Sequence, residues 1–370
     1  MTSRRFQLFT EDSQSSHKTV PRSKNSRIEV GSAWVKTQVA AHLPPESSRK
    51  NNSISTIYKL LGKTLFEGNL FLFEQKEAGG TPEEFIRGPI IGAGACGLSI
   101  KGTFVSAGHD VAMKIHFSNT PCSKTNRSRL QGTKIQVDME LRVRDALAAA
   151  FGAENILTHG MVLSIGDARR VHGFPEMVKG AVSTAVLWNS VLVYPLMKCS
   201  LNDLLSVPGW PREARLYVAK RLIEILSSLH RAGVVDDDSH AGKVALKEGS
   251  GDLFFTDFGE HVSDGPVPNV SRRQRQLQEA SHLGHLVYYA YTGKTCMPFW
   301  LFICTDNVPL DGTVDPIEVG PEELIIQDAI RAPLICNEHE RILPQDITAA
   351  TPLFRDEPHV TNGSTGRENW

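Results

Sequence analysis

The chain lacks a strong net charge and a long hydrophobic run. Its 370 residues carry 40 basic and 41 acidic side chains, so the formal net charge is −1. This balance leaves no basic surplus for a nucleic-acid surface, and we expect no nucleic-acid partner. No run of about 18 apolar residues occurs, so no transmembrane segment is expected. The start "MTSRRFQLFTEDSQSSHK" lacks the apolar segment of a secretory signal, and none is predicted in this chain.

The cysteines also lack a pattern. None of the six stands in a CxxC pair or in another metal-ligand spacing, so neither a structural zinc site nor a dense disulfide framework is expected. What the chain does have is 41% hydrophobic residues, enough for one large domain or two lobes. The cysteines are Cys96, Cys122, Cys199, Cys296, Cys304 and Cys336.

The composition divides the chain into five segments. Residues 1–52 are rich in Ser, Lys, Arg, Asn and Gln, which predicts a mostly disordered basic extension, with membrane or partner docking as the alternative. Residues 53–84 gain apolar side chains and are expected to pack on the first lobe. Residues 85–198 are strand-rich with one helix, and residues 199–355 are mainly helical. Residues 356–370 predict a frayed tail. The fold class is therefore α+β with two lobes.

The expected elements follow from local patterns. Short apolar runs between glycine-bearing turns predict three strands in 85–118 and two in 160–197. Residues 133–152 predict a helix rich in Ala and Leu. Helices are also expected in 200–233, where Gly233 would end the last one. The core face of that helix is predicted to carry Leu216, Leu222, Leu226 and Leu229.

A GxGxxG motif is formed by Gly92, Gly94 and Gly97. This motif occurs in dinucleotide-binding folds, in kinase phosphate loops and in ordinary glycine turns. A dinucleotide site needs a helix directly after the glycines, whereas "LSIKGTF" continues as a strand. A glycine hairpin that covers phosphates therefore fits better.

Three further residues that follow the glycines have side chains suited to phosphoryl transfer. Lys114 in "VAMK" lies seventeen residues after Gly97 and could contact the α- and β-phosphates while paired with a helix carboxylate. Glu140 is the predicted partner and Asp138 the alternative. Asp257 stands in "DFG" and could hold a metal ion.

Together these motifs resemble the eukaryotic protein kinase superfamily over roughly residues 85–355. The more specific similarity is to the rhoptry kinases and pseudokinases of coccidian parasites, through "LHRAGVV", a loosely kept catalytic loop and a basic N-terminal extension. The resemblance makes Tyr194 the gatekeeper of the nucleotide cleft. It also implies a late structural arginine at Arg341, without its usual glutamate, and Glu279 could serve in such an ion pair. It assigns ATP binding to Gly92, Gly94, Gly97, Lys114, the backbone near Leu196 and Met197, and Asp257.

The loop "VVDDDSHAGKVAL" departs from the kinase pattern H-R-D-x-K-x-x-N. Asp238 keeps the position of the catalytic base. Lys243 stands where the family has a metal-binding asparagine, and an ammonium offers three donors and no acceptor. It could pair with Asp238 or Asp257 and mimic part of the cation's role, because unit charges about 4 Å apart interact by roughly 4 kcal/mol at a dielectric near 20. The other changes are Asp236 for His, Asp237 for Arg and His240 for Lys.

Two simpler interpretations of the three aspartates remain open. They could form a solvated acidic turn, because aspartate is common in turns. Alternatively, Asp236, Asp238 and His240 could converge on a dedicated metal ion.

The resemblance predicts a pseudokinase, a nucleotide-stabilised module that regulates a partner protein, either another kinase or a host factor. Losing one preorganised electrostatic group costs about 10² to 10³ in rate, and two are altered, so efficient transfer is not expected. ATP with one Mg²⁺ or none is the implied cofactor. The alternatives are a weakly active Ser/Thr kinase with Asp238 as base, and a cleft that Tyr194 closes to nucleotide. The similarity also implies secretion to the rhoptry or parasitophorous vacuole, against the absence of a signal peptide, and peripheral membrane contact by the basic N-terminus.

Overall fold

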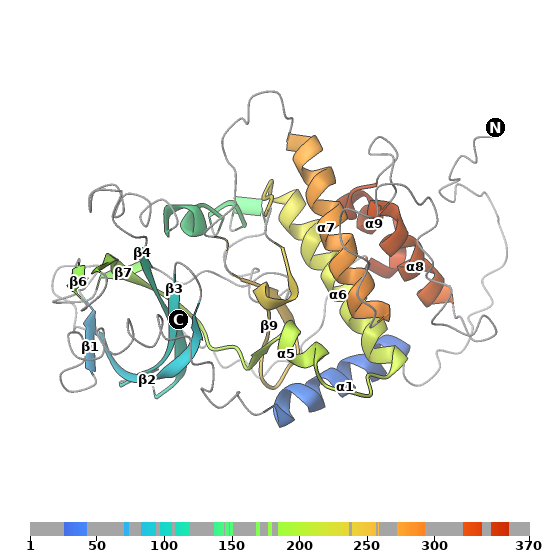
Figure 1. Cartoon of the computed structure of the whole chain (residues 1–370). Coiled ribbons are helices and arrows are strands. Elements are labelled where there is room, and N and C mark those ends of the chain that lie inside the picture. Colours follow the sequence, from blue (N-terminus) through green and yellow to red (C-terminus); the bar gives the residue numbers. More distant parts are fainter. Residues whose placement is uncertain are drawn as a thin grey trace.

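The fold places a β-sheet beside a helical lobe (Figure 1). The structure is a computed structural model. None of the helices in the described part of the chain is long and apolar enough to cross a bilayer. The structure describes residues 26–42, 70–73, 83–93, 97–105, 108–118, 137–143, 145–147, 149–150, 168–170, 177–179, 184–236, 239–256, 258, 272–292, 321–334 and 342–354.

The larger sheet has seven strands in the order β1-β2-β3-β4-β7-β5, with β6 also paired to β7. Its strand pairs are antiparallel. The three strands predicted in 85–118 are present as β2, β3 and β4. The strands are β1 (Leu70–Phe73), β2 (Glu83–Ala93), β3 (Gly97–Phe104), β4 (Asp110–Ser118), β5 (Ala168–Arg170), β6 (Met177–Lys179) and β7 (Thr184–Pro195).

The stretch 160–197 differs from the prediction, because it contains three strands instead of two. β5 and β6 each have three residues and pair with different parts of the long strand β7, at 190–192 and 184–186. Three residues are too few to show the alternation by which a strand is recognised in a sequence. Their position is therefore a result of pairing with β7.

The helical lobe is built around α6, whose fourteen buried residues include the four predicted leucines. Gly233 follows its end with φ of 76°, a conformation that favours glycine. A second sheet of order β10-β9-β8 lies beside these helices. The elements are β8 (Cys199–Ser200), α5 (Leu201–Leu205), α6 (Arg212–Arg231), η1 (Ala241–Lys243), β9 (Val244–Leu246), β10 (Leu253–Phe255), α7 (Arg272–Thr292), α8 (Pro321–Leu334), α9 (Pro344–Ala350) and η6 (Pro352–Phe354).

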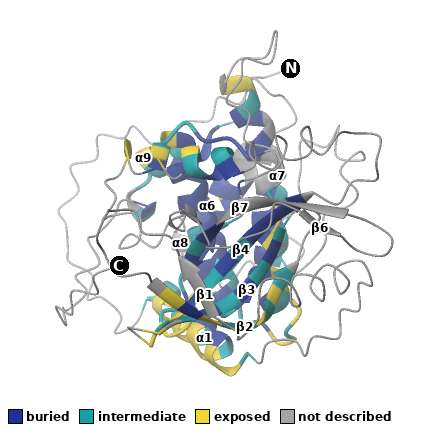
Figure 2. Cartoon of the chain, turned by 90° about the vertical axis from the view of Figure 1, so that its left-hand side faces the viewer, coloured by how far each residue is buried: buried dark blue, intermediate teal, exposed yellow. Residues whose placement is uncertain are grey.

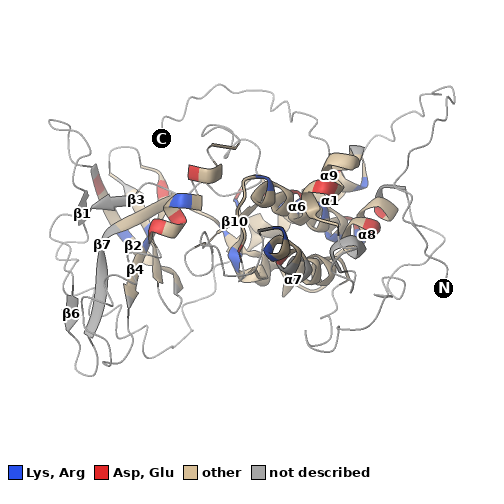
Figure 3. Ribbon diagram, turned by 90° about the horizontal axis from the view of Figure 1, so that it is seen from above, with Lys and Arg blue, Asp and Glu red and all other residues tan. Residues whose placement is uncertain are grey.

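One hydrophobic core joins the helix that contains Glu140 to the helical lobe. Val143 and Leu147 belong to the same buried cluster as Phe258 and the apolar face of α6. Figure 2 shows buried residues concentrated in α6 and along β4. Acidic and basic side chains of the described residues are mixed over both lobes (Figure 3), as expected from the balanced charge.

The expectation of disorder is wrong for part of residues 1–52. Helix α1 (Arg27–Ala41) begins with a capping box between Ser26 and Glu29 and packs below α6 (Figure 1). Val35 and Val39 are fully buried, and the ring centroids of Trp34 and Trp210 are 5.0 Å apart. Helical propensity alone would leave so short a helix marginal, so packing on the helical lobe stabilises it.

The remaining segment boundaries stay predictions. β1 lies within 53–84, and it forms the edge of the larger sheet by pairing with β2. Along the chain, the last strand of the larger sheet is β7, which ends at Pro195, and the first strand of the second sheet is β8, which begins at Cys199. This change of sheet lies close to the predicted division between residues 198 and 199. The predicted tail, 356–370, lies outside the described residues.

Candidate functional site

The two described glycines of the motif lie on paired strands, Gly92 near the end of β2 and Gly97 at the start of β3. Gly92 pairs with Ser99 and Ala93 with Leu98, so the chain returns as a strand directly after the glycines. This excludes the helix that a dinucleotide site would need. A Cβ atom on Gly97 would lie 3.2 Å from Cε of Lys114, so this glycine sits against the lysine side chain. Gly94 lies outside the described residues.

Lys114 forms an ion pair with Glu140, as the sequence predicted. Lys114 lies on β4 between Ser99 of β3 and Leu192 of β7. The Glu140 side chain is fully buried, whereas 13% of the lysine side chain is exposed. Asp138, the alternative partner, is only half-buried. The pair therefore joins the sheet to the helix; its role toward a phosphate stays a prediction.

Glu140 accepts hydrogen bonds from two further side chains. His116 Nε2 lies 3.1 Å from its Oε1, and the Tyr194 hydroxyl donates to its Oε2. Burial alone would raise the pKa of this carboxyl. The Lys114 ammonium and the His116 imidazole outweigh burial and hold the pKa of Glu140 well below its ordinary value. A buried carboxylate is thus kept ionised.

His116 is a partner of Glu140 that was not predicted, although the strand pattern indicated it. Alternate residues of a strand share a face, so His116 lies on the same face of β4 as Lys114 and reaches the same carboxylate. The contact with Tyr194 could not be read from spacing, because 54 residues separate it from Glu140. Tertiary packing alone brings these groups together.

The segment after Tyr194 links the two sheets. Leu196 and Met197 are half-buried, and within the described part of the chain their backbone groups have no hydrogen-bond partner. The next residue, Lys198, anchors the segment through its N–H to the Leu246 carbonyl, at 2.8 Å. Its ammonium lies 2.9 Å from Glu248. Backbone groups near 196 and 197 could therefore meet a ligand, as the resemblance implies.

Lys243 binds Asp236, a partner that we had not assigned. Its Nζ lies 3.2 and 3.3 Å from the two carboxylate oxygens of Asp236, and both side chains are almost completely buried. The predicted partners Asp238 and Asp257 lie outside the described residues, as does Asp237. The sequence did contain an indication of this pair, because the residues at positions 236 and 243 differ from the kinase pattern and carry opposite charges.

Asp236 is also held through its backbone. Its N–H donates to Oε1 of Glu279 at 2.8 Å, while Oε2 of Glu279 lies 2.9 Å from His230 Nε2. Burial raises the pKa of Glu279, and the neighbouring Asp236 carboxylate acts in the same direction against the hydrogen bond from His230. Glu279 therefore anchors the loop to α7. Its suggested role in an ion pair with Arg341 lies outside the described residues.

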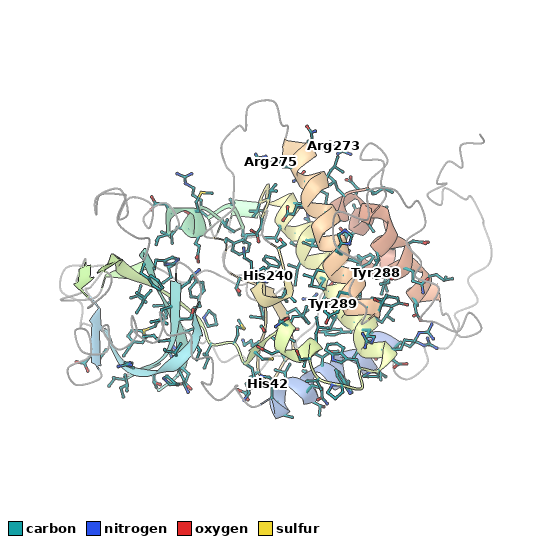
Figure 4. The ribbon with its side chains drawn as sticks, in the orientation of Figure 1. His42, His240, Arg273, Arg275, Tyr288 and Tyr289 are labelled. Carbon is teal, nitrogen blue, oxygen red and sulfur yellow. The ribbon has the colours of Figure 1, made fainter. Side chains whose placement is uncertain are left out.

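The two simpler interpretations of the aspartates lose support. A solvated turn is wrong for Asp236, which has no exposed surface. The metal interpretation needs Asp236 and His240, but Asp236 faces Lys243, and Nδ1 of His240 accepts a hydrogen bond from Gly242. His240 lies at the end of the helical lobe that faces the sheet (Figure 4). No group of three or more His, Cys, Asp or Glu side chains among the described residues could hold a metal ion.

The segment that carries Asp257 is fixed on both sides of that residue. The N–H and hydroxyl of Thr256 both bond to the carbonyl of Lys243, at 2.7 and 3.0 Å. Phe258 is fully buried, and its ring centroid lies 5.7 Å from that of Phe255. Lys243 and Thr256 therefore lie side by side.

Comparison with solved structures identifies the fold. No family model and no curated sequence matches the chain. Among solved structures, it is similar to ROP2 of Toxoplasma gondii, "a virulence factor with a protein-kinase fold and no enzymatic activity", with 17% identity, a TM-score of 0.61, and coverage of 89% of this chain and 95% of that one.

Two other structures are similar over comparable lengths. The Toxoplasma ROP18 kinase domain in complex with AMP-PNP and sucrose has 16% identity, a TM-score of 0.67, and coverage of 88% of this chain and 93% of that one. A Toxoplasma gondii specific rhoptry antigen kinase domain has 19% identity, a TM-score of 0.61, and coverage of 88% and 95%. The predicted two-lobed, α+β protein kinase fold is confirmed.

Proposed function

We propose that this protein is a pseudokinase, a regulatory module that binds ATP between its lobes without efficient phosphoryl transfer. The buried ion pair between Lys114 and Glu140, next to Gly97, carries the proposal. An ammonium held at this place by a carboxylate is suited to bind the α- and β-phosphates. Similar folds fit both parts of the proposal: one is described as having no enzymatic activity, and another is a complex with AMP-PNP.

The described residues fit the nucleotide better than they fit its metal ions. Gly97 lies against the Lys114 side chain, and we propose that Gly92 and Gly97 border the phosphates while the backbone near Leu196 and Met197 binds the adenine ring. A divalent cation would neutralise phosphate charge when bound, but the ammonium of Lys243 cannot ligate it. Asp257 is the remaining candidate ligand, so we propose one Mg²⁺ ion or none.

The module would act on a partner protein, another kinase or a host factor, after secretion to the rhoptry or parasitophorous vacuole. This part rests on the similarity to rhoptry kinases alone. Asp238 as a catalytic base defines the competing proposal of a weak Ser/Thr kinase. The ion pair between Lys114 and Glu140 is compatible with both proposals.

Thermal unfolding with ATP tests the proposal, in Mg²⁺ and in EDTA. At a ligand concentration of about 100 Kd, binding stabilises a protein by about 2.7 kcal/mol and raises the midpoint by several degrees. We expect this shift in both buffers, and its loss in Lys114→Met. The matched control is Lys101→Met, which removes a half-exposed lysine of β3 that pairs with Asp110.

Phosphate transfer to a generic acceptor protein is measured in parallel. Pseudokinase function predicts a shift without transfer. Transfer that disappears in Asp238→Asn would favour the weak kinase. A wild-type protein that ATP does not shift in either buffer would contradict nucleotide binding and favour a cleft closed by Tyr194.

A further inference from the structure

The proposed function does not explain why Lys243 forms a buried pair with Asp236. Only 4% of the lysine side chain and none of the aspartate side chain is exposed. An isolated charge in such a place would be strongly unfavourable, and a partner of opposite charge is what makes it tolerable. Each residue therefore accounts for the burial of the other.

Asp236 connects this pair to the surrounding elements. Its backbone N–H binds Glu279 of α7, and Ser239 donates its hydroxyl to the Asp236 carbonyl at 3.0 Å and lies 3.3 Å from Oδ2. On the other side, the Lys243 carbonyl accepts two hydrogen bonds from Thr256. One ion pair thus links α7, the loop and the segment that carries Asp257.

Both positions differ from the pattern H-R-D-x-K-x-x-N, and the changes compensate each other. A neutral asparagine in place of Lys243 would remove the ammonium that binds the buried Asp236 carboxylate. A histidine in place of Asp236 would remove the carboxylate that binds the buried ammonium. Either change alone takes one charge from a buried pair of opposite charges, whereas the two together conserve neutrality.

We propose that Asp236 and Lys243 form one compensating unit, in which Asp236 is the positioning residue that holds the ammonium, so that the loop keeps its shape without a bound metal ion. In the kinase pattern, the asparagine oxygen ties the loop to a cation only when that cation is present. Here the cation belongs to the chain and is permanent. The part that concerns metal ions rests on the proposed function; the coupling of the two residues does not.

A double-mutant cycle tests the coupling through thermal midpoints. Asp236→Asn and Lys243→Met should each lower the midpoint by about 5 °C or more. The double variant should regain at least about half of the larger loss, since it removes both charges. Lys243→Arg keeps the cation and should lose less than Lys243→Met. If a single variant does not fold while the double variant does, the coupling is supported.

The matched control is the exposed pair of Lys198 and Glu248, 2.9 Å apart. Lys198→Met, Glu248→Gln and their double variant should each stay within about 2 °C of the wild type. Additive losses at Asp236 and Lys243, with no recovery in the double variant, would overturn the compensating unit.

The dependence on metal ions is a readout that a purely structural role would not change. The ATP-induced midpoint shift of the wild type should be present both in Mg²⁺ and in EDTA. In the variant Asp236→His with Lys243→Asn, the restored oxygen ligand should make the shift at least about twofold larger with Mg²⁺. Equal shifts in both buffers for this variant would contradict the proposal. If ATP shifts no protein at all, the proposed function fails, and the cycle alone decides the coupling.

Discussion

At the scale of single residues, Glu140 connects its helix to the larger sheet. Its carboxylate is fully buried and receives hydrogen bonds from Lys114, His116 and Tyr194, which come from β4 and β7. Each partner would lose its acceptor if the carboxylate were removed. The position of the helix relative to the sheet therefore depends on one ionised group, and it does so without any bound ligand.

The pH dependence of Glu140→Gln tests this. In the folded protein the pKa of Glu140 lies below its ordinary value of 4.5. The contribution of Glu140 to stability is therefore present above pH 4.5, and it is lost as the pH falls from 4.5 through the lower pKa of the folded state. We expect urea unfolding at neutral pH to show a loss of about 3 kcal/mol. Wild type and variant should converge on acidification.

The control is Asp138→Asn, a half-buried carboxylate on the same helix, which should cost much less. The raised pKa of Glu279 acts with the opposite sign, because its contribution is lost as the pH rises through the folded value. It is common to both proteins and cancels in their difference. Parallel curves for wild type and Glu140→Gln across the acid range would contradict the prediction.

At the scale of elements, α1 shows how closely two helices can approach at a glycine. A Cβ atom on Gly31 would lie 2.0 Å from the carbonyl oxygen of Glu213 in α6. Arg27 reaches Glu323 of α8 at 3.5 Å, while the outer face of α1 is exposed (Figure 2). The buried residues of α1 are Gly31, Val35 and Val39, and Trp34 packs beside them on Trp210.

Gly31→Leu should therefore undock α1. The added side chain collides with backbone that cannot move aside, and the burial of Val35 and Val39, worth about 1.5–3 kcal/mol each, is lost. Hydrogen exchange should show α1 amides unprotected while α6 stays protected. Ala33→Leu, at an exposed position of the same helix, is the control and should leave exchange unchanged. Retained protection of α1 in Gly31→Leu would show that the contact is looser than described.

At the scale of the whole molecule, Glu323 joins four helices. Its buried carboxylate lies 2.7 Å from Arg212 of α6 and 3.5 Å from Arg27 of α1, and it accepts a hydrogen bond from Tyr291 of α7. Burial, together with this hydrogen bond, raises the pKa of Tyr291 to about 12. The Glu323 carboxylate thus holds α1, α6 and α7 to α8.

Glu323→Gln should lower the unfolding free energy by about 3 kcal/mol, because it removes the buried carboxylate that binds Arg212, Arg27 and Tyr291. Circular dichroism and tryptophan fluorescence should shift together in urea if the helices unfold as one unit. Leu324→Gln replaces the adjacent residue, which is 50% exposed, and should change the free energy by less than about 0.5 kcal/mol. Equal effects of both substitutions would contradict a role for Glu323 in joining the helices.

The sequence predicted the parts of the site whose members lie on regular elements. The glycine hairpin could be anticipated because apolar residues follow Gly97 with the pattern of a strand. The partner of Lys114 could be anticipated because Glu140, Val143 and Leu147 recur at helical spacing, and both apolar residues are buried. Helix α1 could not be anticipated, since a glycine on its buried side and alanines on its exposed side leave hardly any apolar periodicity.

The sequence alone thus determined the order of strands, glycine turn, lysine and glutamate, because backbone periodicity and turn chemistry act over a few residues. Only the tertiary structure decided which charges meet: Asp236 with Lys243, Tyr194 with Glu140, Glu323 with Arg212. The physical reason is that a buried charge needs some partner, but spacing along the chain does not specify which. The packing of elements that are distant in the sequence determines the partner, and in the loop it places Lys243 against Asp236.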